Sequence, residues 1–174
     1  MDNQDEISNV NFDDPVFYKH FREKNENYDF IEKVLLNLAL CHTIIIEKKN
    51  GKTNYNASSP DELALVNAAR FFGVKFEDRD EENKMYINFK GEQQVWKLLN
   101  LIEFNSTRKR MTVVVQDPKG IIKVLCKGAD SVLYPLCVKK TNEQIQIENK
   151  TNAFLEEYAK EGLRTLLLVE KTMS

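Results

Sequence analysis

An aromatic side chain stands beside a dense cluster of cations in the segment 103–111, whose order is Glu-Phe-Asn-Ser-Thr-Arg-Lys-Arg-Met. Apolar and polar residues alternate on both sides of it, which predicts two strands that each bury one face. The ring of Phe104 and several cations would then lie near the same sheet surface, an arrangement that suits an adenine base with a phosphate tail. The alternative from this segment alone is a half-buried strand followed by a solvated basic turn.

A second candidate group lies at a predicted helix start, Ser59-Pro60-Asp61-Glu62. Ser is a favoured N-cap, Pro suits the first helical position, and a Glu three residues after the cap completes a capping box. Glu62 therefore has two candidate roles. It either accepts from the backbone N–H of Ser59, or accepts a hydrogen bond from an adenine amino group in a pocket.

Two cations complete the set of candidate residues. Lys127 and Gly128 lie where a predicted strand gives way to a helix, so that a ligand can approach the glycine backbone while the lysine supplies a point charge. An ordinary strand-to-helix turn with Asp130 as N-cap is the alternative. Arg164 follows a helix-ending Gly162 and precedes an apolar run, which places its guanidinium at the sheet end beside Lys127, unless it is simply solvated.

Hydrophobic periodicity predicts the elements that position these residues. The expected fold class is α+β, a mainly antiparallel sheet with flanking helices. A turn at 117–120 predicts a hairpin, a second turn is expected at 50–51, and the helix over 28–41 is expected to bury Phe30, Ile31, Val34, Leu35, Leu38 and Ala39. Helices are expected over 15–23, 28–41, 59–72, 130–137 and 143–161, and strands over 42–47, 74–76, 85–89, 95–104, 111–115, 121–125 and 166–169.

Composition narrows the function classes. The 174 residues carry a net charge of −2, which disfavours a nonspecific nucleic-acid binder and makes any anion site a local one. The three cysteines are widely spaced without a CxxC pair, so a disulfide framework or a zinc site is not expected, and a reducing cytosolic setting fits best. The apolar stretches are far shorter than the roughly 20 residues that cross a bilayer.

In their order along the chain, the segments 59–62, 103–111, 127–130 and 162–166 resemble the nucleotide-binding domain of P-type ATPases. The segments 58–62 and 108–111, together with 38–43, are most similar to the type IV branch, the phospholipid-transporting flippases. The resemblance covers residues 12–169. It implies a peripheral lead-in at 1–11 and a single nucleotide-binding domain at 12–174 that belongs to a larger membrane ATPase.

The resemblance also implies a site and a division of labour. Phe104 would stack on adenine, Glu62 would contact the base edge, Lys127 would line the pocket floor, Ser106 would lie beside the nucleotide, and Arg164 would reach toward the phosphates. ATP would arrive with Mg²⁺, whose ligands lie mainly on a separate phosphorylation domain. No catalytic residue and no metal ligand is assigned within these 174 residues, since the Asp-Lys-Thr-Gly motif of the phosphorylated aspartate occurs nowhere in them.

The chain alone is thus expected to be soluble and to bind ATP without turnover, while the parent enzyme translocates lipid. Its partners would be the phosphorylation and actuator domains of the parent, with room for a small membrane accessory subunit, and it would face the cytosol at a cellular membrane. Three other hypotheses stay open. They are a cation-transporting P-type ATPase, a nucleic-acid or acidic-partner module built on Phe104 and the basic run, and a protein scaffold with a vestigial pocket.

Overall fold

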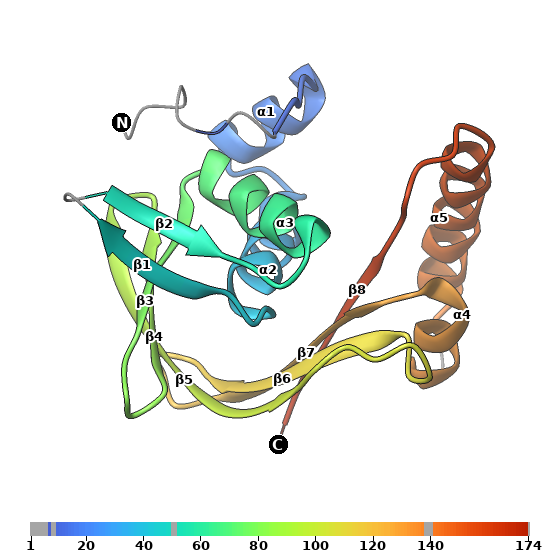
Figure 1. The fold of residues 1–174 in the computed structure, drawn as a ribbon. Coiled ribbons are helices and arrows are strands. Elements are labelled where there is room, and N and C mark those ends of the chain that lie inside the picture. The colour runs from blue at the N-terminus through green and yellow to red at the C-terminus, as the bar shows by residue number, and fades with distance from the viewer. Residues whose placement is uncertain (1–6, 8–9, 50–51, 138–140, 174) are drawn as a thin grey trace.

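The computed structural model describes residues 7, 10–49, 52–137 and 141–173 (Figure 1). Helices and strands alternate irregularly, as expected for an α+β domain. The helices are α1 (Pro15–Glu23), α2 (Tyr28–Leu40), α3 (Pro60–Phe71), α4 (Asp130–Leu133) and α5 (Asn142–Lys160), with a 3₁₀ turn η2 (Tyr134–Leu136) after α4. The strands are β1 (Ile45–Lys49), β2 (Lys52–Asn56), β3 (Val74–Arg79), β4 (Lys84–Phe89), β5 (Glu92–Ile102), β6 (Arg110–Gln116), β7 (Ile122–Gly128) and β8 (Leu167–Thr172).

The main sheet has six strands in the order β3-β4-β5-β6-β7-β8, and every neighbouring pair is antiparallel. Consecutive strands are neighbours throughout, although α4 and α5 are inserted before β8. The register shifts between Phe76 and Asp78 in β3 and between Leu98 and Asn100 in β5, and such bulges increase the local bend of a strand. β1 and β2 form a separate antiparallel hairpin.

Helices α2 and α3 lie on the concave face of the curved sheet, while α5 stands beside β8 at the other end of the molecule (Figure 1). Alternation along each strand directs one set of side chains toward these helices. The core between the layers includes Leu40, Val66, Phe76, Ile87 and Val113, each of which is almost completely buried. Burial of this apolar surface is the main term that holds the helices on the sheet.

The terminal helix α1 is held to α3 by aromatic contacts. Asp14 caps the helix by accepting from the N–H groups of Val16 and Phe17, at 2.8 and 3.0 Å. The ring of Phe17 lies 4.7 Å from that of Phe72, and Phe12 meets the same ring edge-on at 5.1 Å. The aromatic cluster therefore docks the N-terminal part of the described chain onto the end of α3.

Most of the predicted elements are confirmed, but the strand predicted over 95–104 ends at Ile102, the strand β2 was not predicted, and four further differences follow. The segment 130–137 is a four-residue α-helix followed by a 3₁₀ turn, because Pro135 interrupts the α-helical hydrogen bonds. Leu35, Leu38 and Ala39 are buried on α2 as predicted, but Phe30 and Val34 are exposed, because α3 and β3 cover only part of the apolar stripe.

The other two differences concern strands. The segment expected to form the last buried strand is the edge strand β8, which is half-buried at its start and exposed from Glu170 onward. The strand predicted over 42–47 begins only at Ile45, since His42 and Thr43 are used for hydrogen bonds described below. The turn expected at 50–51 lies outside the described residues.

Candidate functional site

Four chain segments meet at one end of the sheet. In an antiparallel order β5-β6-β7-β8, the end of β5, the start of β6, the end of β7 and the start of β8 necessarily lie at the same end. Phe104 and Ser106 lie in the β5–β6 connection, Lys127 lies near the end of β7, and Arg164 lies just before β8. The topology therefore gathers four of the five predicted site residues from segments far apart in the sequence.

Lys127 is the buried cation of this region. In the strand register, Lys127 lies opposite Met111 on β6 and opposite Leu168 on β8. The side chain is only 7% exposed, and Nζ has no hydrogen-bond partner among the described residues. Burial lowers the pKa of Lys127, and attraction to Cys41 and Glu62 only partly opposes that effect. A buried ammonium without an acceptor is costly, so the position is suited to a ligand that brings one.

Cys41 is the thiol that lies over the same strands. Its Sγ is 3.9 Å from the carbonyl oxygens of Met111 and Leu125. Burial raises the pKa of Cys41 to about 12, so the thiol stays protonated at neutral pH. It serves as a small packing group between α2 and the sheet, and not as a nucleophile.

Glu62 is buried at the start of α3 and is held by Thr43. The backbone N–H and the hydroxyl of Thr43 donate to the two carboxylate oxygens, each at 2.8 Å. Ser59 caps α3 as predicted by accepting from the N–H groups of Asp61 and Glu62. The capping-box role considered for Glu62 is wrong, because its carboxylate turns to Thr43 on the segment between α2 and β1. The carboxylate attracts the Lys127 ammonium electrostatically but forms no hydrogen bond to it.

Phe104 lies two residues beyond β5 and is 59% exposed. Because this large ring is exposed at the end of the sheet where the four segments meet, one of its faces is accessible for stacking on a planar ligand. The next residues form a turn in which the Asn105 side chain accepts from Arg108 N–H at 2.7 Å, and Ser106 is exposed at the beginning of that turn. The loop thus exposes both the Phe104 ring and Ser106 to solvent.

The basic run is partly used by its own loop. The guanidinium of Arg108 donates to the Glu103 carbonyl at 3.2 Å, and that of Arg110 donates to the Arg108 carbonyl at 3.4 Å. Lys109 is exposed and has a φ of 49°. The guanidinium groups of Arg108 and Arg110 thus stabilise the conformation of their own loop. Their hydrogen bonds assign them a structural role in the loop and no contact with a ligand.

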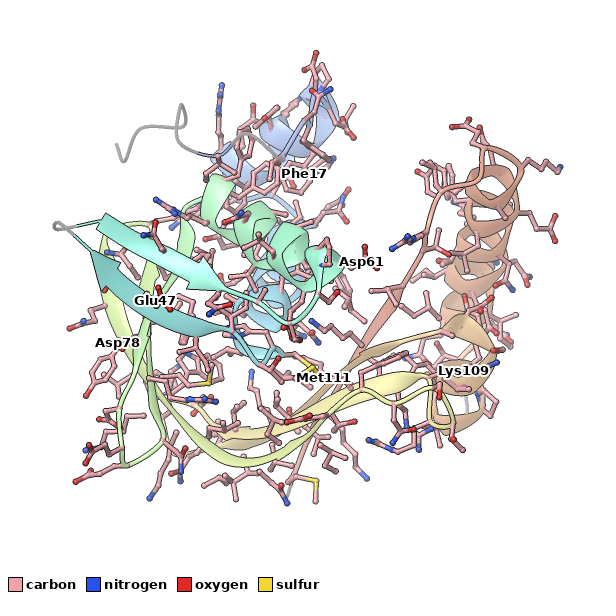
Figure 2. The ribbon with its side chains drawn as sticks, viewed as in Figure 1. Phe17, Glu47, Asp61, Asp78, Lys109 and Met111 are labelled. Carbon is pink, nitrogen blue, oxygen red and sulfur yellow. The ribbon has the colours of Figure 1, made fainter. Side chains whose placement is uncertain are left out.

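Arg164 forms an ion pair with Asp61 in which the single nitrogen Nη1 donates to both carboxylate oxygens, at 2.8 and 2.7 Å. Its side chain is 83% exposed, and exposed ion pairs contribute at most about 1 kcal/mol. Figure 2 shows Asp61 at the start of α3 and Met111 on the sheet below it. The ion pair therefore holds the Arg164 guanidinium at the start of α3, against the residue that precedes Glu62.

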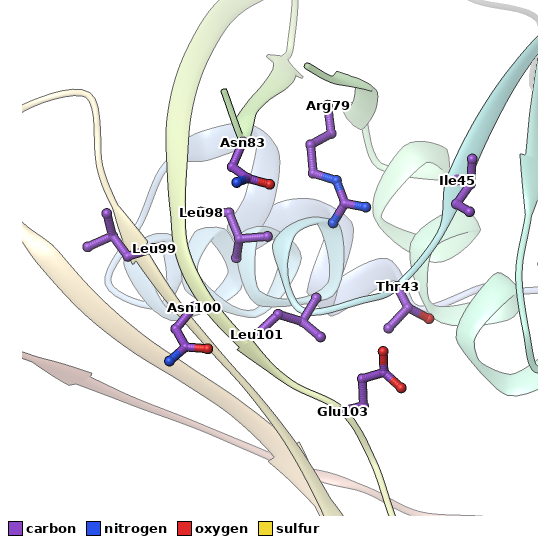
Figure 3. A pocket seen from close by; sticks show the side chains of 9 residues that line it. All are labelled: Thr43, Ile45, Arg79, Asn83, Leu98, Leu99, Asn100, Leu101 and Glu103. Carbon is purple, nitrogen blue, oxygen red and sulfur yellow. The ribbon is translucent and has the colours of Figure 1, made fainter. Parts of the chain in front are cut away.

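A pocket of about 500 Å³ adjoins the candidate site residues at Thr43 and Glu103 (Figure 3). Two of its lining residues connect it to the site, because Thr43 holds Glu62 and Glu103 directly precedes Phe104. None of the five predicted site residues lines it. The lining consists of Thr43, Ile45, Arg79, Asn83, Leu98, Leu99, Asn100, Leu101 and Glu103.

Sequence reasoning missed three participants. Thr43 holds Glu62, Asp61 holds Arg164, and Met111 lies beside Lys127 on the neighbouring strand β6. The turn at 117–120 sets the register of the β6–β7 hairpin, so the pairing of Met111 with Lys127 could have been predicted from the sequence. Thr43 and Asp61 carried no such signal, because their partners lie on other elements.

Neither a membrane span nor a metal cluster is found among the described residues. None of their helices combines the length and apolarity needed to span a bilayer. No group of three or more His, Cys, Asp or Glu side chains in the described ranges is placed to hold a metal ion.

Comparison with known proteins places the chain in a family. The family described as P-type ATPase, cytoplasmic domain N matches residues 30–174. The chain is 44% identical over 137 residues to human phospholipid-transporting ATPase ID, covering 78% of this chain and 11% of that protein. It is 41% identical over 165 residues to phospholipid-transporting ATPase DNF1 of Chaetomium thermophilum, covering 92% of this chain and 10% of that protein.

A third relative gives the same result. Human phospholipid-transporting ATPase IC is 38% identical over 159 residues, which cover 90% of this chain and 12% of that protein. The chain spans only about a tenth of the length of these relatives. The antiparallel sheet with flanking helices agrees with the family match. The chain belongs to the family of P-type ATPase cytoplasmic N domains.

Proposed function

We propose that this chain is the ATP-binding module of a phospholipid-transporting P-type ATPase. It would present the γ-phosphate of ATP to an aspartate on a separate phosphorylation domain of the parent protein. The names of the relatives support a lipid over a cation as the transported substrate. The parent would lie in a cellular membrane with this module on its cytosolic face.

The observation that carries the proposal is the buried ammonium of Lys127, which lacks an acceptor among the described residues. Protein folding leaves few buried polar atoms unpaired, and each one that remains needs an explanation such as a functional role or a bound ion. The neighbouring groups narrow the class of ligand. An exposed aromatic ring, a buried carboxylate and a buried cation at one sheet end suit a nucleobase with hydrogen-bond donors and acceptors on its edge.

Each of the five residues would contact a different part of the nucleotide. Phe104 stacks on the adenine ring, Glu62 accepts from the exocyclic amino group, and Lys127 donates to a ring nitrogen or a ligand oxygen from below. Ser106 lies beside the nucleotide. Arg164 exchanges its exposed pair with Asp61 for a phosphate, a substitution of one charge-assisted contact by another.

The rest of the reaction would belong to other parts of the parent protein. Phosphoryl transfer needs an in-line nucleophile and charge neutralisation by Mg²⁺, whose ligands we assign mainly to the phosphorylation domain. The actuator domain and a small membrane accessory subunit are further proposed partners. This chain therefore supplies recognition and positioning, and we expect binding of ATP without turnover.

Substitution of Phe104 by alanine tests the proposed function. ATP affinity of the 174-residue chain is expected to fall about tenfold, because stacking of a base on an aromatic ring is worth about 1–3 kcal/mol. The melting temperature should hardly change, since the ring is mostly exposed. Isothermal titration with Mg-ATP and a thermal melt measure the two quantities.

Phe154→Ala is the matched control. Phe154 is 55% exposed and lies on α5, where its ring stacks on Tyr158 at 6.2 Å. This variant should bind ATP like the unchanged chain. Equal affinity of the Phe104 and Phe154 variants would refute the assigned stacking surface.

Lys127→Met is expected to change stability and binding in opposite directions. Removing a buried charge that has no acceptor should raise the free energy of unfolding by about 1 kcal/mol. The same change should weaken ATP binding about tenfold or more, because a charge-assisted hydrogen bond is lost. Urea denaturation and ATP titration of one sample decide both points.

Lys123→Met, on the same strand but near its other end, controls for the loss of a positive charge. It should leave ATP affinity unchanged. A Lys127→Met variant that is less stable and still binds ATP normally would contradict the role given to this ammonium.

The nucleic-acid hypothesis predicts a different salt response. A polyanion loses affinity steeply as salt rises, because counterions are released on binding. Titrations with ATP and with a single-stranded oligonucleotide at two salt concentrations separate the two ligands. The use of Arg108 and Arg110 inside their own turn argues against the oligonucleotide.

A further inference from the structure

The carboxylate of Glu62 could take either of two hydrogen-bonded positions. As the third residue of α3 it is spaced to accept from the N–H of its N-cap Ser59, which would close the capping box. It instead accepts from the N–H and the hydroxyl of Thr43, at 2.8 Å each. Ser58 adds only a long contact of 3.5 Å to one of the same oxygens.

The same molecule contains a closed capping box for comparison. At the start of α5, Thr141 accepts from the N–H of Gln144 at 3.2 Å, and the Gln144 side chain accepts from the N–H of Thr141 at 3.0 Å. Both helices have the cap residue and the third-position side chain that the motif needs. What distinguishes the start of α3 is the presence of Thr43, which offers two donors from another segment.

We propose that Thr43 is a positioning residue, which keeps the Glu62 carboxylate out of the capping box and turned toward the nucleotide. This inference rests on the proposed function. Each oxygen of Glu62 accepts one hydrogen bond from Thr43 and keeps a second lone pair for the base edge. Thr43 also lines the pocket beside the site (Figure 3), so its hydroxyl holds the carboxylate from the pocket side.

Thr43→Val removes the hydroxyl donor and keeps the size and branching of the side chain. Glu62 then keeps only the backbone N–H of residue 43 as a donor at 2.8 Å, and the Ser59 N–H in the same helix turn should compete for the released carboxylate oxygen. We expect ATP affinity to fall about tenfold, equivalent to one hydrogen bond to a charged group. The melting temperature should change little, since the capping contact replaces the lost one.

Thr43→Ser restores the hydroxyl and should bring ATP affinity back to within about twofold of the unchanged chain. Thr151→Val makes the same chemical change on α5, where the Thr151 hydroxyl donates to Ile147 O at 2.9 Å, and should not alter binding. Amide hydrogen exchange at Ser59 is a second readout. It should slow in Thr43→Val, because the capping box closes. Thr43→Ala carries the same expectations and replaces the valine variant if that variant does not fold.

The outcomes are distinguishable. If Thr43→Val binds ATP normally while Glu62→Ala and Phe104→Ala bind weakly, the positioning role is overturned and the proposed site stands. If affinity and melting temperature fall together and serine does not rescue binding, Thr43 is only structural. If none of the three variants affects binding, the proposed function itself fails.

Discussion

Gly128→Ala is expected to lower the free energy of unfolding by about 3 kcal/mol, one of the larger effects that a single methyl group can have. A Cβ at this position would lie 2.6 Å from both Arg110 Cβ and Lys109 O, and 2.8 Å from Arg110 Cα. Gly128 is paired directly with Arg110 across the β6–β7 ladder. Because all three clashing atoms belong to the backbone or are its first side-chain carbon, neither strand can relieve the contact by rotating a side chain.

The damage should extend to the site. Ala129 N–H donates to the Lys109 carbonyl at 3.1 Å, just beyond the clash, and Lys127 precedes it on the same strand. Separation of β6 and β7 at this end would move the Lys127 ammonium relative to the loop that carries Phe104. Urea denaturation measures the stability loss, and ATP titration measures the loss of binding.

Gly162→Ala isolates the steric effect. Gly162 has a φ of +73°, and no atom lies within 4 Å of the position that a methyl group would take there, so alanine meets backbone strain alone. Its expected cost is about 1 kcal/mol. A Gly128→Ala variant that loses no more stability than Gly162→Ala would show that the β6–β7 approach is looser than described.

Acidification from pH 7 to pH 5 is expected to remove about 2 kcal/mol of stability through His42. The imidazole is almost completely buried, its Nε2 donates to Ala39 O at 2.8 Å, and its Nδ1 accepts from Ile44 N–H at 3.1 Å. These bonds fix the neutral tautomer with its proton on Nε2. Protonation of Nδ1 would set two hydrogens against each other in a buried site.

The sign follows from the pKa. Burial is the largest cause that lowers the pKa of His42, to about 3 from 6.5 in the unfolded chain, and repulsion by Lys127 and Arg79 acts in the same direction. Between these values the unfolded chain binds the extra proton, so stability falls as the pH falls below 6.5. The limiting slope is about 1.4 kcal/mol per pH unit. Above pH 7 this contribution is constant.

His42→Gln replaces the imidazole by a carboxamide, which can still donate and accept hydrogen bonds but does not titrate. Urea denaturation at pH 7, 6 and 5 should show a smaller loss of stability in this variant than in the unchanged chain. The range avoids Asp80, whose lowered pKa places its titration in stronger acid. Parallel pH profiles for the two proteins would remove His42 as the source of the acid sensitivity.

The sequence could predict what local chemistry determines. The Ser59 cap, the turn at 117–120 and the helix end at Gly162 follow from side-chain hydrogen bonding and backbone freedom, and all three are confirmed. Strand alternation likewise predicted the β6–β7 hairpin. The family resemblance then supplied the roles that these local patterns left open.

What escaped prediction depends on contacts between distant segments. The Glu62 carboxylate accepts from Thr43 in place of the Ser59 N–H that a capping box requires. Arg164 pairs with Asp61, which lies 103 residues away in the sequence. The exposure of Phe30 shows the same limit, since periodicity detects an apolar stripe on α2 but not how much of it another element covers. The assigned ATP contacts of the five site residues remain predictions.

The open sheet has a consequence for how copies of this chain meet. A sheet with free edges offers its unpaired N–H and C=O groups as a template for a strand from another molecule. Both edges here carry features that oppose this. β3 has a bulge beside Asp78 and Arg79, and the second half of β8 carries the exposed charged residues Glu170 and Lys171. Edge-to-edge polymerisation is therefore disfavoured on both sides of a sheet that never closes on itself.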